Sequence, residues 1–141
     1  MNTLNVLIVD DSESMRQIIR RVLKPLDVTV LEGCRAKEGM QILLHEPVDL
    51  LITDWNMLEL DGLEFTRILR SLPQFEQLPI LMLSNHSSEA TRREALEAGI
   101  DVFVSKFAPI EEWRDGVTWL LTGPRHESWS RAASPRSRQV S

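Results

Sequence analysis

The sequence has one cysteine, no tyrosine and no long apolar run. With Cys34 alone, an internal disulfide and a cysteine-based metal site are both excluded. No apolar run approaches the roughly 20 residues that a membrane-spanning helix needs. The first residues also lack the basic segment followed by an apolar stretch that marks a secretory signal. We therefore expect a cytoplasmic protein that does not enter the membrane.

Acidic and basic residues are unevenly distributed along the chain. The net charge is −5, but residues 124–141 contain four Arg and one Glu and so carry +3, which leaves −8 for residues 1–123. An acidic domain with a short basic tail is not typical of a dedicated nucleic-acid binder. We expect one globular domain over 1–123 without direct DNA binding, and a disordered basic tail over 124–141.

Apolar and amphipathic runs alternate five times along the domain. The short apolar runs predict strands that are covered on both faces, at 6–9, 28–31, 48–53, 79–83 and 102–105. Runs with helical spacing lie at 12–24, 35–45, 62–71, 87–98 and 109–121. Strict alternation of strand and helix predicts an α/β fold, a doubly wound five-stranded parallel sheet with helices on both faces.

Particular residues mark several helix boundaries. Pro25 ends the first helix because its ring cannot continue a helix, and Pro109 is expected to open the last one, where a missing N–H has no partner to lose. Gly99 follows the fourth helix in the position that favours left-handed backbone. Ser87 or Asn85 is expected to cap that helix at its start. The apolar face of the first helix is expected to consist of Met15, Ile18, Ile19, Val22 and Leu23.

Polar side chains stand at the predicted carboxyl ends of four strands. Asp10 and Asp11 end the first strand, Asp54 the third, Ser84 the fourth and Lys106 the fifth. In a doubly wound sheet, ligands bind outside the carboxyl ends of the strands. Three carboxylates at one edge repel each other, and one lysine cannot neutralise them. A hard divalent cation can, and clustered carboxylates with carbonyls and waters suit Mg²⁺. A cation, a carboxylate nucleophile and a lysine are what phosphoryl transfer to Asp requires.

Four short motifs follow one another at the ends of the predicted strands. They are Val9-Asp10-Asp11, Asp54 followed by Met57 and Asp61-Gly62, Leu83-Ser84, and Val104-Ser105-Lys106. Together they resemble the receiver domains of two-component response regulators, including the single-domain chemotaxis regulators. The resemblance covers about residues 4–122. It implies a flavodoxin-like (βα)5 fold with strand order 2-1-3-4-5.

The resemblance implies metal-binding roles for four residues. Asp10 and Asp11 match the acidic pair of the family, with Asp11 as the direct Mg²⁺ ligand and Asp10 as the residue that holds metal-bound water. Asp54 matches the phosphoacceptor and also touches Mg²⁺. Asn56 matches the position whose backbone carbonyl completes the metal shell.

The resemblance also implies roles in transfer and switching. Ser84 matches the hydroxyl that reaches the phosphoryl group, and Lys106 matches the lysine that pairs with a phosphoryl oxygen. Phe103 matches the switch aromatic, here without a phenol hydroxyl. Three positions depart from the family: Phe107 stands where Pro is usual after the lysine, Asn85 replaces a small residue after the hydroxyl, and Leu58 replaces a frequent Pro after Met57.

The function implied is a phosphorylation switch, not an enzyme that turns over small substrates. A histidine kinase or histidine phosphotransfer protein would donate the phosphoryl group to Asp54. Ser84 and its loop would then move inward and Phe103 would fill the vacated space. The surface of the fourth helix, fifth strand and fifth helix would change shape for a target protein. The resemblance fits a monomer or a phosphorylation-dependent dimer.

Other interpretations remain open for these residues. Asp10 and Asp11 could simply stabilise a helix N-terminus, and the whole domain could be a degenerate receiver that binds partners independently of phosphorylation. A Mg²⁺-dependent phosphatase would need an acid–base carboxylate two residues after the nucleophile, where this sequence has Asn56. A flavin-binding protein would need a phosphate-cradling loop after the first strand, and the loop here is too acidic.

Overall fold

The computed structural model of the protein describes residues 3–122, which form five strands and five α-helices in strict alternation. The strands are β1 (Leu4–Val9), β2 (Val28–Gly33), β3 (Leu50–Asp54), β4 (Ile80–Ser84) and β5 (Val102–Ser105). The helices are α1 (Glu13–Leu23), α2 (Ala36–His45), α3 (Gly62–Arg70), α4 (Glu89–Ala98) and α5 (Ile110–Thr122), with a short 3₁₀ turn, η1 (Pro73–Phe75), after α3. The predicted basic tail lies outside the described residues.

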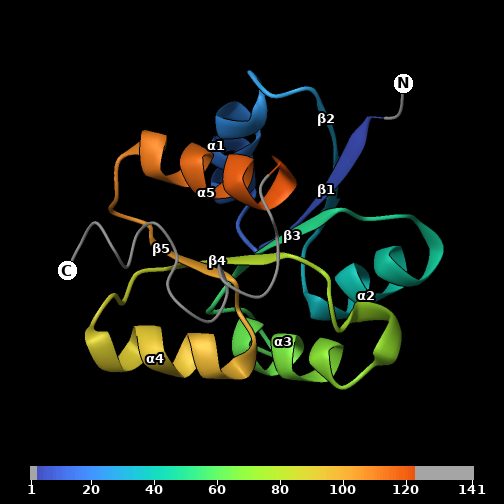
Figure 1. Ribbon diagram of the computed structural model, residues 1–141, viewed down its shortest axis with the longest axis vertical. Helices are drawn as coiled ribbons and strands as arrows, with labels where there is room; N and C mark the ends of the chain where they lie inside the picture. The colour runs from blue at the N-terminus through green and yellow to red at the C-terminus, as the bar shows by residue number, and fades with distance from the viewer. Residues whose placement is uncertain (1–2, 123–141) are drawn as a thin grey trace.

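All strand pairs are parallel, in the order β2-β1-β3-β4-β5. Figure 1 shows α1 and α5 on one face of the sheet and α2, α3 and α4 on the other. This arrangement confirms the doubly wound α/β fold and the strand order that the receiver resemblance implies. Since every strand is parallel, the carboxyl ends of β1, β3, β4 and β5 meet at one edge of the sheet.

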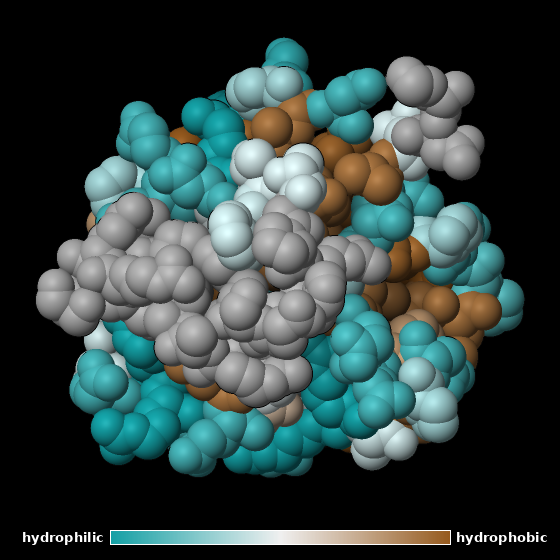
Figure 2. Space-filling view, viewed as in Figure 1, coloured by the Kyte–Doolittle hydropathy of each residue, from teal (hydrophilic) through white to brown (hydrophobic). Residues whose placement is uncertain are grey.

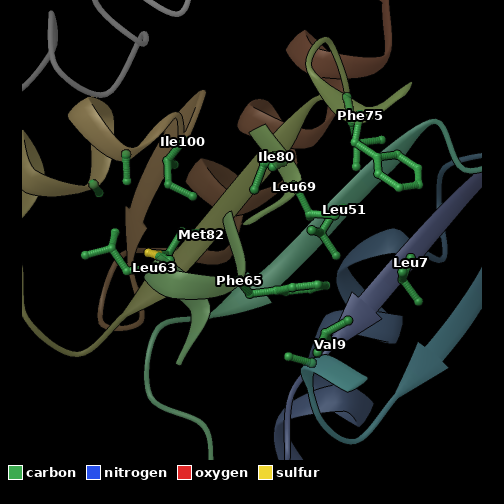
Figure 3. Close-up of a cluster of buried hydrophobic side chains, with 14 of the residues drawn as sticks. Leu7, Val9, Leu51, Leu63, Phe65, Leu69, Phe75, Ile80, Met82 and Ile100 are labelled. Atoms are coloured by element: carbon green, nitrogen blue, oxygen red, sulfur yellow. The ribbon is translucent and has the colours of Figure 1, made fainter. Parts of the chain in front are cut away.

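The core consists of two apolar layers, one on each face of the sheet. Residues alternate between them along each strand, so that Leu7 and Val9 face α2–α4 whereas Val6 and Ile8 face α1 and α5. Figure 3 shows the first layer, in which Phe65 lies among side chains of the strands and of α3. Because both faces are covered, the strands read as continuous apolar runs in the sequence.

Two glycines sit where a side chain would be strained. Gly99 ends α4 with φ 112°, which confirms the predicted left-handed position. At the start of α3, a Cβ on Gly62 would lie 2.1 Å from the carbonyl oxygen of Asp54. The helix can therefore begin directly against the end of β3 only with glycine here.

Two sequence expectations about the helices were wrong. Ser88, and not Ser87 or Asn85, caps α4, because its hydroxyl accepts from the Thr91 backbone N–H at 3.1 Å. Ile18, assigned to the apolar face of α1, is 36% exposed. The buried face of α1 is narrower than the apolar pattern and includes Arg16, which the pattern did not predict.

The surface in Figure 2 is mostly hydrophilic, with apolar side chains gathered on the right, where Figure 1 places α2. Leu44 of α2 is among the exposed large apolar side chains, at 55%. Among residues 3–122, no helix is long and apolar enough to cross a membrane.

Candidate functional site

The carboxylates of Asp10, Asp11 and Asp54 converge at the carboxyl edge of the sheet. Each contributes one oxygen to a group whose members lie within 4.8 Å of one another. Asp10 directly follows β1 and is 1% exposed, and Asp54, the last residue of β3, is 5% exposed. Asp11 is exposed. The pairing of β1 with β3 places these strand ends side by side, as the sequence predicted.

Lys106 reaches this cluster from the end of β5. Its Nζ lies 2.8 Å from Asp54 Oδ1. Its backbone N–H donates to the Ser84 carbonyl at 2.8 Å, so the β4–β5 ladder extends to the lysine itself. The Lys106 side chain therefore extends from a fixed backbone position to the Asp54 carboxylate. It is not an ordinary surface lysine.

Burial and nearby negative charge raise the pKa values of Asp10 and Asp54. Burial raises the pKa of Asp10 from its ordinary value to about 6; a hydrogen bond from the Ser12 N–H opposes the shift, and the Asp54 charge adds to it. Burial also raises the pKa of Asp54, against the opposing effect of Lys106. Two buried carboxylates held with one ammonium group leave negative charge that the protein does not balance.

The chemistry of the oxygen donors fits a small hard cation. Asp10 Oδ2 is buried and accepts no hydrogen bond from the described residues, so one oxygen of a clustered carboxylate has no partner within residues 3–122. Such an atom is unfavourable unless a cation or water meets it. Carboxylate oxygens at several strand ends are the ligands that Mg²⁺ prefers.

The remaining predicted residues lie at the same edge of the sheet. Ser84 ends β4, is fully buried, and accepts a hydrogen bond from the His86 N–H through its hydroxyl at 3.0 Å. It directly follows Leu83, the ladder partner of Asp54. Asn56 is exposed, two residues beyond Asp54. The structure thus brings Ser84 and Asn56 to the same edge as Lys106 and the three carboxylates.

Phe103 lies in the core beneath this edge. It is 2% exposed, on the strand β5 that Lys106 directly follows. Its ring meets that of Trp55 edge-to-face at a centroid distance of 6.1 Å, and the Arg92 guanidinium carbon lies 5.9 Å from its centroid. Trp55 follows Asp54 directly, so one ring contact links the residue after Asp54 to the predicted switch aromatic.

The departure at Phe107 leaves the lysine in place. Among the described residues no peptide bond is cis, so the bond between Lys106 and Phe107 is trans. The Phe107 side chain is 81% exposed and points away from the core, while Lys106 still meets Asp54 at 2.8 Å. Proline at this position is therefore not needed for the ion pair.

The sequence analysis missed Arg16, which is 8% exposed and contacts Asp10 from the buried face of α1. Its Nη1 donates to the Asp10 carbonyl at 2.5 Å, its Nε donates to Glu32 at 3.0 Å, and its Nη2 pairs with Glu13. The only signal in the sequence was the spacing of Glu13, Arg16 and Arg20 on one helix face, which is equally typical of a solvated ion-pair row.

Comparison with known proteins gives one consistent result. Residues 6–118 match the family described as the Response regulator receiver domain. The chain is 38% identical over 109 residues to "Chemotaxis protein CheY homolog" of Campylobacter jejuni, covering 75% of this chain and 84% of that protein. It is 32% identical over 103 residues to "Sensor histidine kinase CheAY" of Helicobacter pylori, covering 72% of this chain but 13% of the kinase.

Solved structures agree with the sequence comparisons. The chemotaxis response regulator CheY4 of Vibrio cholerae superposes with a TM-score of 0.78 at 28% identity, over 85% of this chain and all of that one. The signal receiver domain of a signal transduction histidine kinase from Syntrophus aciditrophicus gives a TM-score of 0.79 at 28% identity, over 89% and 96% of the two chains.

Proposed function

The chain belongs to the response regulator receiver domain family, and from that premise we propose that Asp54 is the residue that accepts the phosphoryl group. The observation that carries the assignment is the 2.8 Å ion pair of Asp54 with Lys106 inside a cluster of three carboxylates. Of the three, Asp54 is the one paired with the lysine. Lys106 would lie beside a phosphoryl group on Asp54 and offset its negative charge.

The reaction is a transfer from phosphohistidine of a histidine kinase or histidine phosphotransfer protein. A carboxylate oxygen of Asp54 attacks phosphorus in line, an O–P bond forms and the P–N bond breaks. The electron pair of that bond leaves on the histidine nitrogen, which takes up a proton from solvent. Lys106 stays beside the phosphoryl oxygens and offsets their charge.

A divalent cation completes the charge balance. We assign Mg²⁺ to Asp10, Asp11 and Asp54, with the backbone carbonyl of Asn56, and we expect Asp11 to be the direct ligand while Asp10 acts through water. When bound, the ion neutralises the carboxylates and the phosphoryl oxygens. The orphan Asp10 Oδ2 and the uncompensated negative charge support this assignment.

The response to phosphorylation is a change of shape. The Ser84 hydroxyl, now bonded to its own loop through the His86 N–H, would turn to the phosphoryl group and draw that loop inward. Phe103 would then move into the vacated space and change its present ring contact with Trp55. The face formed by α4, β5 and α5 would then present a different surface to a target protein.

The same assignment indicates which kinds of protein would donate the phosphoryl group and receive the signal. The chemotaxis regulators and the chemotaxis-type kinase among its relatives favour a histidine kinase or phosphotransfer protein as donor and a protein as target. We propose a cytoplasmic switch that resets by hydrolysis at Asp54, as monomer or phosphorylation-dependent dimer. Residues 1–123 would be the receiver, followed by a basic tail.

The test uses the fluorescence of Trp55 and the other tryptophans. Mg²⁺ is titrated into the protein, and beryllofluoride is then added to imitate the bound phosphoryl group. We expect a saturable response to Mg²⁺ and a second response to beryllofluoride that Asp54→Asn does not show. A beryllofluoride response that persists in Asp54→Asn would contradict Asp54 as acceptor. No response in either protein, with no phosphoryl adduct after incubation of the parent with acetyl phosphate and Mg²⁺, would favour a phosphorylation-independent binding module.

A further inference from the structure

Arg16 occupies an unusual position for an arginine. It lies on the face of α1 that packs against the sheet and is 8% exposed, although a buried guanidinium must have all its donors satisfied to be tolerated. Its three partners lie in different elements: the Asp10 carbonyl after β1, Glu32 of β2 and Glu13 of α1.

The contact with the Asp10 carbonyl replaces a missing ladder bond. The β1–β2 ladder ends at Val9 and Gly33, and the Asp10 N–H makes the last strand-like bond, to the Gly33 carbonyl at 3.1 Å. Within residues 3–122, no backbone N–H outside the regular ladders donates to the Asp10 carbonyl. Arg16 Nη1 supplies the donor instead, at 2.5 Å. The Asp10 carbonyl is thus held by Arg16 of α1, and the Asp10 N–H is held by Gly33 of β2.

Fixing both backbone groups of Asp10 fixes its carboxylate. The side chain has one further anchor, the Ser12 N–H bonded to Oδ1 at 2.9 Å, while Oδ2 is buried without a hydrogen-bond partner among the described residues. Outer-shell partners of this kind orient metal ligands and affect metal affinity strongly. The neighbouring Asp11 shares the same stretch of backbone and would shift with it.

We propose that Arg16 is a positioning residue for the Asp10–Asp11 pair, and that its bond to the Asp10 carbonyl sets the Mg²⁺ affinity of the site. The inference rests on the proposed function, because it presumes that the cluster binds Mg²⁺. In this proposal Arg16 acts through the Asp10 backbone carbonyl and contacts neither the ion nor the phosphoryl group.

Arg20 provides a matched control within the same helix. It pairs with the same two carboxylates, Glu32 at 2.6 Å and Glu13 at 3.3 Å, but not with the Asp10 carbonyl. Arg16→Gln and Arg20→Gln therefore each remove one positive charge and two ion pairs from one network. They differ in the backbone contact and in the burial of the side chain.

The sign of the effect separates positioning from electrostatics. Removing a positive charge near a divalent site would by itself strengthen cation binding, because repulsion is reduced. Loss of positioning would weaken it. A rise in the Mg²⁺ dissociation constant that is confined to Arg16→Gln cannot come from the change of charge.

The experiment measures Mg²⁺ binding by calorimetry on the parent protein, Arg16→Gln, Arg20→Gln and Arg16→Lys, at a temperature where near-UV circular dichroism shows each to be folded. We expect the dissociation constant to rise about 10-fold in Arg16→Gln and to change less than about twofold in Arg20→Gln. Arg16→Lys keeps the charge but cannot reach three acceptors at once, so an intermediate rise is expected.

Each outcome decides the proposal. Equal Mg²⁺ affinity in the parent and Arg16→Gln, or equal weakening in Arg16→Gln and Arg20→Gln, would overturn it. If Arg16→Gln does not fold, Arg16→Lys decides instead, and an unchanged dissociation constant there would overturn the proposal. A parent protein that binds no Mg²⁺ would overturn the proposed function, and this inference with it.

Discussion

Replacing Asp10 with Asn should stabilise the protein in the absence of Mg²⁺, and the gain should depend on pH. Burial raises the pKa of Asp10 from 3.8 to about 6. Between these values the folded protein holds a proton that the unfolded chain releases, so the stability of the parent falls as pH rises from about 4 to about 6. Each pKa unit corresponds to ~1.4 kcal/mol, so the loss reaches about 3 kcal/mol at most.

Asp10→Asn removes that loss while keeping the shape of the side chain and the acceptor for the Ser12 N–H. Urea unfolding should show the variant more stable than the parent by about 1–3 kcal/mol at pH 8, and nearly equal to it at pH 4. Asp11→Asn, at an exposed position, is the control and should change stability much less. Adding Mg²⁺ should stabilise the parent and leave Asp10→Asn nearly unaffected. A parent whose stability is flat from pH 4 to 8 without Mg²⁺ would refute the reasoning.

Two further predictions concern the scaffold that holds the site. Gly62→Ala places a Cβ 2.1 Å from the Asp54 carbonyl oxygen and should lower the free energy of unfolding by at least ~2 kcal/mol in a urea titration; an unchanged midpoint would show that the helix start is not tightly packed. Arg70→Gln removes hydrogen bonds to three backbone carbonyls and an ion pair with Asp101, so we expect a loss of about 2–3 kcal/mol. Arg67→Gln, in an exposed pair within α3, should lose less than ~0.5 kcal/mol, and equal losses in the two variants would contradict this account.

The fold and the site edge were predictable because their signals are local. Strands covered on both faces read as apolar runs, and each polar residue of the site directly ends or follows such a run. Val6 to Val9 leads to Asp10, and the apolar run that ends at Thr53 leads to Asp54. Once the strands are parallel, these ends must meet. The polar strand ends at one edge therefore followed from the order of residues, whereas the strand order and the roles of Asn56 and Phe103 came only from the resemblance to receiver domains.

Features that depend on distant packing were not predictable in this way. Arg16 is buried because Glu32 and the Asp10 carbonyl face it from the sheet, and nothing near residue 16 records that arrangement. Arg70 likewise meets Asp101 across a separation of 31 residues. Ile18 shows the reverse case, an apolar residue at helical spacing that is 36% exposed.

The capping residue of α4 was missed for a different reason. Several hydroxyl and amide side chains precede the helix, and each has the chemistry of a cap. The choice depends on the path of the loop after Ser84, where the Ser84 hydroxyl accepts from the His86 N–H. Ser88 is the first hydroxyl placed to accept from Thr91.

Phosphoryl transfer to Asp54 is tested most directly by the intact mass of the protein after incubation with acetyl phosphate and Mg²⁺, followed by peptide mapping of the adduct. The account predicts one phosphoryl group on the peptide that contains Asp54, formed only when Mg²⁺ is present and absent in Asp54→Asn. A phosphoryl group that maps to another residue, or no adduct in the parent although Mg²⁺ binds, would contradict it.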